Sequence, residues 1–115
     1  MASAARELVR RLVAQHRVVV FSKTYCPYSM DAKAVVRSAT KGIASSSSIK
    51  DKLLVLELDQ RGDESDMQAA LSELTGRTFG PTVWVGGKFI GGSTETRDLY
   101  EGGKLEKMVN SAMAS

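Results

Sequence analysis

The chain has 115 residues, of which 43% are hydrophobic and 25% charged, and its net charge is +3. This length and composition suit a single soluble domain over residues 1–115 with a core of its own. The charge is mild and no basic run is interleaved with aromatics, so nucleic acid is not an expected partner, and no apolar stretch approaches the length of a membrane span.

The N-terminal segment is predicted to be an amphipathic helix over Ser3–Gln15. Its apolar residues recur at helical spacing: Leu8, Val9, Leu12 and Val13. The alternative is a transit peptide, since the segment is rich in Ala and Arg, but Glu7 interrupts its basic face. We therefore expect a mature cytoplasmic protein. An organelle would be the compartment if this N-terminus belongs to a processed or truncated form.

The next part of the chain predicts strand, helix and strand. Val18–Ser22 is a β-branched and aromatic run, typical of a strand covered on both faces. A helix is predicted from Pro27 to about Ala39, ended by Gly42. Its predicted buried face holds Met30, Ala34 and Val35. After a Ser-rich loop, Ala44–Ser48, a second strand is expected at Leu53–Leu58.

The remaining chain predicts a helix, a hairpin and two helices. Asp63 starts the first helix, with Asp66 in a pattern like a capping box, and Gly76 ends it. The apolar face of that helix is Met67, Ala70, Leu71 and Leu74. Strands Thr82–Val85 and Lys88–Ile90 flank a Gly86-Gly87 turn. Ser93 is expected to cap the next helix, and Gly102-Gly103 separate it from a last helix with Leu105, Met108, Val109 and Ala112. The order predicts a small mixed α/β sheet with helices on both faces.

The only cysteine, Cys26, lies where the first strand gives way to a helix. Pro27 suits the first helical position, and the unpaired amides of a helix start favour a thiolate. Lys23 would lower the pKa of this thiol further, and Ser29 could donate its hydroxyl or its amide to the sulfur. The alternatives are a buried structural cysteine, a solvated Lys23 and a Ser29 that is merely tolerated. Because the neighbours are mostly not aliphatic, the sequence favours a reactive thiol.

Two other segments could converge on this thiol. Pro81 follows Gly80 at a strand start and could follow a cis peptide bond, which would expose backbone for pairing with an extended ligand. From sequence alone a trans bond is the commoner case. Gly91-Gly92 lead into Ser93-Thr94, where free helix amides could hold a carboxylate or phosphate or could form a plain N-cap.

Four stretches then occur in one order: Lys23-Thr24-Tyr25-Cys26-Pro27-Tyr28, Leu74-Thr75-Gly76, Pro81 followed by a strand, and Gly86-Gly87-Lys88-Phe89-Ile90-Gly91-Gly92-Ser93. Together they resemble the glutaredoxin family, and the likeness runs from Glu7 to Met113. The resemblance implies a thioredoxin-like α/β fold with a four-stranded mixed sheet, and a cis Pro81 facing Cys26. It also implies glutathione as cosubstrate, with no metal and no membrane partner expected, and a monomer acting on glutathionylated proteins.

By position, the resemblance makes Cys26 the catalytic nucleophile, supported by Lys23, Pro27, Tyr28 and Ser29. It also implies a glutathione-binding set: Lys23 and Gln68 on the glycine carboxylate, Tyr28 along the groove, Gly80 backbone beside Pro81 on the cysteinyl part, and the Ser93 and Thr94 amides on the γ-glutamyl carboxylate.

The sequence departs from the family's pattern at several positions. Ser29 stands where dithiol members have a second cysteine, so no internal disulfide can form; whether this serine is natural or an engineered Cys→Ser change is left open. Thr78 replaces a frequent arginine, Phe79-Gly80 the usual Thr-Val, and Thr94 a common aspartate. These changes bear on the affinity for glutathione more than on its orientation.

The expected activity is a monothiol thiol–disulfide exchange that removes glutathione from proteins and mixed disulfides. One alternative is a dimer whose two Cys26 thiolates and two glutathiones ligate a [2Fe-2S] cluster; by resemblance, the stiff Pro27 loop disfavours it. Another is a non-catalytic glutathione-binding module. A Cys–His hydrolase is poorer still, because His16 lies across the strand and no orienting group is evident.

Overall fold

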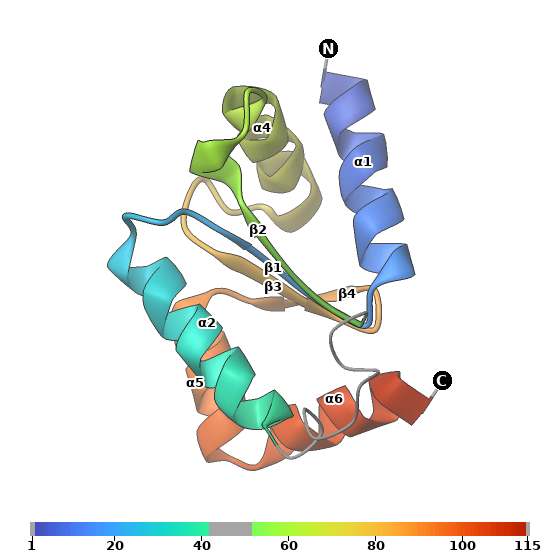
Figure 1. Cartoon of the computed structure of the whole chain (residues 1–115), viewed down its shortest axis with the longest axis vertical. Helices are drawn as coiled ribbons and strands as arrows, with labels where there is room; N and C mark the ends of the chain where they lie inside the picture. Colours follow the sequence, from blue (N-terminus) through green and yellow to red (C-terminus); the bar gives the residue numbers. More distant parts are fainter. Residues whose placement is uncertain (1, 42–51, 115) are drawn as a thin grey trace.

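The computed structural model describes residues 2–41 and 52–114, which form one sheet with helices on both faces (Figure 1). The elements are α1 (Ala2–Gln15), β1 (Val18–Ser22), α2 (Pro27–Thr40), β2 (Leu53–Glu57), the 3-10 helix η1 (Leu58–Gln60), α4 (Glu64–Thr75), β3 (Thr82–Val85), β4 (Lys88–Gly91), α5 (Ser93–Glu101) and α6 (Lys104–Ala114). The predicted order of helices and strands is confirmed, and η1 is an addition to it.

The sheet has the strand order β2-β1-β3-β4. β1 runs parallel to β2 and antiparallel to β3, so that Val20 lies opposite Val55 on one side and Val83 on the other. Every residue of β1 is buried, whereas β2 at the edge is half-buried throughout. The unbroken apolar run of β1 therefore occupies a central strand, as such runs do when both faces are covered.

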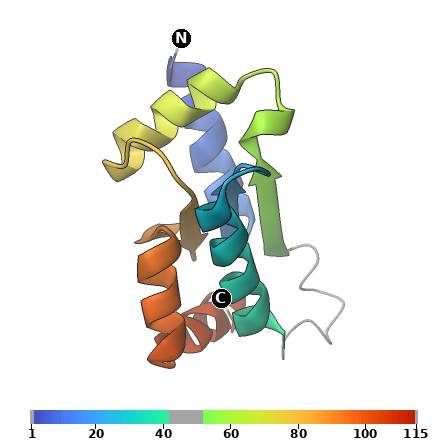
Figure 2. The same cartoon turned by 90° about the vertical axis from the view of Figure 1, so that its left-hand side faces the viewer.

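The two faces of the sheet carry separate cores. Because side chains alternate along a strand, Val19 and Phe21 pack on one face and Val18 and Val20 on the other. Helices α1 and α4 cover the first face, and α2, α5 and α6 cover the second (Figure 1). Viewed at right angles, α2 and α5 lie side by side (Figure 2).

The β3–β4 hairpin turns on Gly86 and Gly87, with φ of 60° and 82°. Two successive positive φ values define the turn that matches strand twist, and glycine adopts them without a steric penalty. The predicted two-residue turn is confirmed.

The buried face of α2 differs from the prediction. Val35 is buried as expected, but Met30 is 57% exposed and Ala34 is also exposed. Ala32 and Val36, one turn apart, face the sheet instead. Met30 is two positions before Ala32, which places it on the opposite side of the helix.

Two predicted element ends also need correction. Leu58, expected in the second strand, begins η1. Asp63 precedes α4 but makes no capping bond through its side chain, because the Arg61 guanidinium binds both of its carboxylate oxygens, at 2.8 and 3.0 Å. The C-terminal stop of α4 at Gly76 is confirmed by its left-handed φ of 75°.

Some predictions fall on residues that the structure does not describe, namely the helix stop at Gly42 and the loop Ala44–Ser48. Within the described ranges, no helix has the length and apolarity needed to cross a membrane.

Candidate active site

Cys26 is the residue immediately before α2 and closes the loop that leaves β1. Its backbone is extended, with φ −92° and ψ 120°, and Pro27 occupies the first turn. The Cys26 carbonyl accepts the amide of Met30 at 3.0 Å, while its own amide donates to the Lys23 carbonyl at 3.2 Å. The thiol therefore stands at the helix N-terminus, where backbone amides lack partners within the helix and the helix dipole is positive.

The pKa of the Cys26 thiol is lower than its ordinary value. Partial burial raises it, but hydrogen bonds from the amide and the hydroxyl of Ser29 and from the amide of Tyr28 outweigh burial, and the charge of Lys23 adds to them. Both Ser29 groups named from the sequence thus face the sulfur. The net effect favours the thiolate, which is the nucleophilic form.

Further contacts fix the loop that carries the thiol. The Ser29 hydroxyl is buried and accepts the Lys23 amide at 3.2 Å. On the other side, the Asp59 carboxylate, in η1, accepts the amide of Thr24 at 2.9 Å and its hydroxyl at 2.5 Å. The loop is therefore tied to both α2 and η1. The sequence pattern does not predict the Asp59 contact, because Thr24 lies in the loop after β1 and Asp59 lies in η1, far along the chain.

Lys23 and Gln68 line one depression, of about 400 Å³, beside α4. The Lys23 ammonium lies 3.2 Å from a carboxylate oxygen of Glu64. The Gln68 amide nitrogen donates to the Thr78 carbonyl at 3.4 Å, and its buried Oε1 has no hydrogen-bond partner in the described part of the chain. The two residues predicted to bind the same glutathione carboxylate thus lie together, although the Glu64 carboxylate already pairs with Lys23.

A second groove, of about 180 Å³, brings together the predicted glutathione-binding residues other than Lys23 and Gln68. Its lining includes Tyr28, Gly80, Pro81, Ser93 and Thr94. They come from the start of α2, the loop before β3 and the start of α5, so segments far apart in sequence meet here. Cys26 is not part of either lining, but Tyr28 and Lys23 connect its loop to both.

The Gly80–Pro81 peptide bond is trans, which corrects the cis bond implied by the family resemblance. Gly80 has φ +95°, a conformation that residues with a side chain rarely adopt. The chain makes its bend into β3 through this glycine.

Ser93 does not cap α5 as predicted; it is the first residue of the helix, and Gly92 precedes it. The Gly92 amide donates to a carboxylate oxygen of Glu95 at 2.9 Å, so the capping group is a side chain from within the helix. The Ser93 hydroxyl is engaged elsewhere: it donates to Asp31 of α2 at 2.7 Å. Arg97 binds the same Asp31 carboxylate, which ties α5 to α2.

Glu95 and Arg77 were missed from the sequence. The Arg77 guanidinium lies 2.6 Å from the Glu95 carboxylate and 5.6 Å from the centre of the Phe89 ring. The Arg77 hydrogen bond, followed by that of the Gly92 amide, lowers the pKa of Glu95 to about 2. The spacing of Gly92 and Glu95, which suits a helix start, was the one available signal.

Large exposed hydrophobic side chains gather on the segments around the thiol. In the described part of the chain they are Tyr25, Tyr28, Met30 and Phe79, with 57–77% of their surface exposed. Three of them lie within four residues of Cys26, and Phe79 shares the groove with Tyr28.

Comparison with known proteins agrees with this geometry. The family model described as Glutaredoxin matches residues 18–90. Glutaredoxin-C8 of Oryza sativa subsp. japonica is 45% identical over 102 residues, which are 89% of this chain and 69% of that protein. The rice protein named Monothiol glutaredoxin-S6 is 35% identical over 92% of this chain and 73% of its own length.

The chain belongs to the glutaredoxin family. Members of this family are glutathione-dependent oxidoreductases, and the fold is thioredoxin-like. Among solved structures, oxidized glutaredoxin 2 from Chlamydomonas reinhardtii has a TM-score of 0.85 and 36% identity, covering 99% of this chain and 98% of that one. A buckwheat glutaredoxin–glutathione complex has a TM-score of 0.83 and 33% identity, covering 98% and 94%.

This glutaredoxin departs from the family's pattern around its groove. Thr78, in the position of a frequent arginine, contributes its carbonyl to Gln68. The guanidinium of Arg77, one residue earlier, is committed to Glu95. Thr94 is exposed at the start of α5. The groove is therefore lined by an internal ion pair, Arg77–Glu95, and by the exposed Thr94.

Proposed function

We propose that this glutaredoxin removes glutathione from mixed disulfides by a monothiol mechanism. The observation that carries the proposal is the single thiol, Cys26, held at the start of α2 by donors that favour its thiolate. The thiolate attacks the glutathionyl sulfur of a mixed disulfide, and the partner leaves as a thiolate that takes a proton. A second glutathione thiolate then attacks the Cys26-bound glutathionyl sulfur, which forms glutathione disulfide and returns Cys26 to its thiolate.

Both steps benefit from a low thiol pKa. In the first step the thiolate is available at neutral pH, and in the second Cys26 is the better leaving group. Since the chain has one cysteine, the second thiol has to come from outside the protein. Glutathione supplies it in this proposal.

The groove and the depression beside the thiol would orient glutathione. Lys23 and Gln68 would hold its glycine carboxylate, and Tyr28 would line the peptide. The Gly80 backbone beside Pro81 would pair with the cysteinyl part. The amides of Ser93 and Thr94 would take the γ-glutamyl carboxylate. The shared lining of these residues and the buckwheat glutaredoxin–glutathione complex support this assignment.

Binding in this way has to compete with contacts already made within the protein. Glu64 holds Lys23, and Glu95 takes the Gly92 amide next to the proposed carboxylate site. Both acids repel an incoming carboxylate. We therefore expect a modest affinity for glutathione and a rate that rises with its concentration well into the millimolar range.

We propose that the mixed-disulfide substrates are glutathionylated proteins. Tyr25, Tyr28 and Met30 flank the thiol with exposed apolar surface. Exposed patches of this kind commonly contact another protein, and the client segment around the modified sulfur would lie against them. We propose that the enzyme works as a monomer.

Intact-mass analysis after exposure to glutathione disulfide tests the proposal. One glutathione should add at Cys26 and should leave when excess reduced glutathione is supplied. Cys26→Ser should take up none and should turn over a mixed disulfide only at the uncatalysed rate. An enzyme that forms no adduct at neutral pH would contradict the proposal, because its thiol would not be activated.

A further inference from the structure

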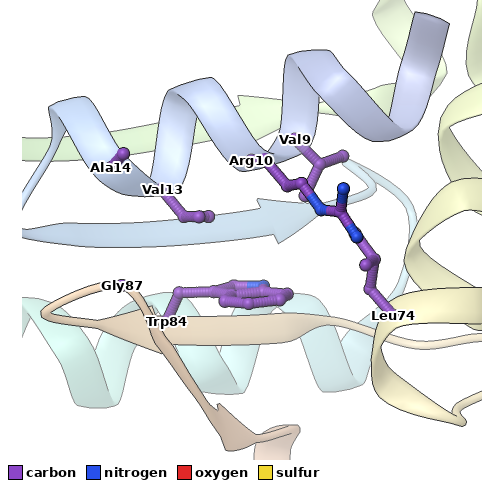
Figure 3. A pocket seen from close by; sticks show the side chains of 7 residues that line it. All are labelled: Val9, Arg10, Val13, Ala14, Leu74, Trp84 and Gly87. Atoms are coloured by element: carbon purple, nitrogen blue, oxygen red, sulfur yellow. The ribbon is translucent and has the colours of Figure 1, made fainter. Parts of the chain in front are cut away.

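A cavity of about 380 Å³ lies between α1, the end of α4 and the β3–β4 hairpin (Figure 3). It belongs to the face of the sheet covered by α1 and α4, whereas Cys26 immediately precedes α2, which covers the other face. The proposed reaction makes no use of this cavity. Its size falls in the range of pockets that hold small molecules.

The interior of the cavity is apolar. Val9 and Val13, one turn apart on α1, point toward the ring of Trp84 on β3, with Leu74 at one end (Figure 3). The indole N–H of Trp84 donates to the Thr82 hydroxyl at 3.2 Å. The Trp84 ring can therefore meet an apolar ligand without losing a hydrogen bond.

One charged side chain stands at this cavity. Arg10, from the exposed side of α1, extends toward Leu74 (Figure 3), and no acidic side chain is in the lining. Arg6, one turn earlier, is paired with Glu73 at 2.9 Å. For Arg10, no ion pair or hydrogen bond is formed with any residue that the structure describes.

An unpaired guanidinium at the rim of an apolar cavity is complementary to an amphipathic anion. Its planar N–H groups match a carboxylate in a two-pronged contact, while the apolar wall favours removal of a hydrocarbon body from water. An uncharged apolar ligand would leave the guanidinium without a partner. Exposed Arg11 beside it adds positive potential without lining the cavity.

We propose that this cavity is a second ligand site, which binds a small carboxylic acid with an alkyl or aryl body of about eight carbons. The body lies against the apolar lining of the cavity, and the carboxylate meets Arg10. An affinity on the order of 0.1 mM is expected for a ligand of this size. The proposal is independent of the function proposed for Cys26.

Trp84 is the only tryptophan of the chain, so its fluorescence reports on the cavity directly. The probes are octanoate and 3-phenylpropionate, with octanol as the uncharged match, titrated into the full chain. Octanoate should change the Trp84 emission in a saturable manner, and saturation-transfer NMR on the ligand gives a second reading. Octanol should bind at least about tenfold more weakly.

Three variants locate the contact. Arg10→Gln should weaken octanoate binding about tenfold, whereas Arg11→Gln, also at an exposed position and one residue away, should leave it unchanged. Ala14→Leu should fill the cavity and abolish binding of both octanoate and octanol. The proposal is overturned if neither method shows saturable octanoate binding, if octanol binds as tightly as octanoate, or if the Arg10 and Arg11 variants bind alike. Unchanged turnover of a mixed disulfide would show that all three variants remain folded.

Discussion

Ser29 controls both the thiol and the loop that carries it. A hydroxyl can donate one hydrogen bond and accept up to two. Here it accepts the Lys23 amide and donates to the Cys26 sulfur. Burial of Ser29 keeps water from replacing either contact. A cysteine at this position would offer a weaker donor to the sulfur, in exchange for a second thiol.

Ser29→Ala should raise the pKa of Cys26. Removing the hydroxyl takes away one of the groups that lower the pKa of Cys26, so this pKa rises and the pH–rate profile moves to higher pH. Since the Ser29 and Tyr28 amides remain, the rate constant at neutral pH should fall by only about fivefold, in line with one lost hydrogen bond of about 1 kcal/mol.

Ultraviolet absorbance of the thiolate against pH measures the shift in the pKa directly. Ser38→Ala is the matched control, because it makes the same substitution at an exposed position of the same helix. An unchanged titration of Cys26 in Ser29→Ala would contradict the role given to the hydroxyl.

The connection between α4 and β3 joins the groove to the start of α5 through a small number of contacts. Arg77 reaches Glu95, and Glu95 in turn takes the Gly92 amide. The bend at Gly80 then leads into β3.

Glu95→Gln should alter the pH dependence of stability. The pKa of Glu95 is about 2 in the folded protein against an ordinary value of 4.5. Because the folded value is depressed, the contribution of Glu95 is present above about pH 4.5 and is lost as the pH falls toward 2. The ion pair is partly exposed, so solvent screening reduces this contribution to about 1 kcal/mol.

Urea unfolding at several pH values tests this expectation. The variant should be less stable at neutral pH and should lose less stability than the parent between pH 4.5 and 2. Glu106→Gln, on the exposed side of α6, is the control. Parallel stability curves for the parent and Glu95→Gln would argue against the contact.

Gly80→Ala tests the bend before β3. A Cβ at this position meets nothing within 4 Å, so the cost is that of holding an alanine at φ +95°. We expect a loss of stability of about 1 kcal/mol or more and a raised KM for glutathione, since the bend shapes the proposed groove.

Gly62→Ala is the matched control for this prediction, because Gly62 also has open space around its Cα and does not have a positive φ. Thermal unfolding and steady-state kinetics provide the two measurements. Equal behaviour of the two alanine variants would mean that the Gly80 bend imposes no conformational demand.

The same elements show what the sequence could reveal. Helices, strands and the hairpin follow from apolar periodicity and from glycine pairs, which are local signals. The assignments that failed depend on side-chain partners that periodicity does not identify. Ser93 donates its hydroxyl to Asp31, 62 residues earlier, and the Asp63 carboxylate is taken by Arg61, two residues before it. Met30 was misplaced because its apolar character does not reveal which side of α2 the sheet covers. The thiol was recognised because its environment is built from adjacent residues.

In the whole molecule, one sheet lies between two cores and contributes side chains to both. Val19 and Phe21 serve one core and Val18 and Val20 the other, all from the same strand. Loss of packing on either face therefore disturbs β1, which carries the thiol loop at its end. The two halves are expected to unfold together.

Leu71→Ala and Leu105→Ala test this cooperativity. Both leucines are fully buried, with Leu71 on the α4 face and Leu105 on the α6 face. Each substitution should lower the free energy of unfolding by about 2–5 kcal/mol. Both variants should keep a single unfolding transition, seen alike by Trp84 fluorescence and by far-ultraviolet circular dichroism. Two separate transitions would show that the cores are independent.

The single cysteine also has consequences for the oxidation of this protein by peroxide. Oxidation of a thiolate gives a sulfenic acid, which is rescued when another thiol condenses with it and releases water, and which otherwise advances to the irreversible sulfinic acid. In this chain the neighbouring position holds the oxygen of Ser29 and not a sulfur, so rescue depends on a thiol arriving from solution. Recovery of oxidised Cys26 is thus expected to depend on the surrounding pool of small thiols.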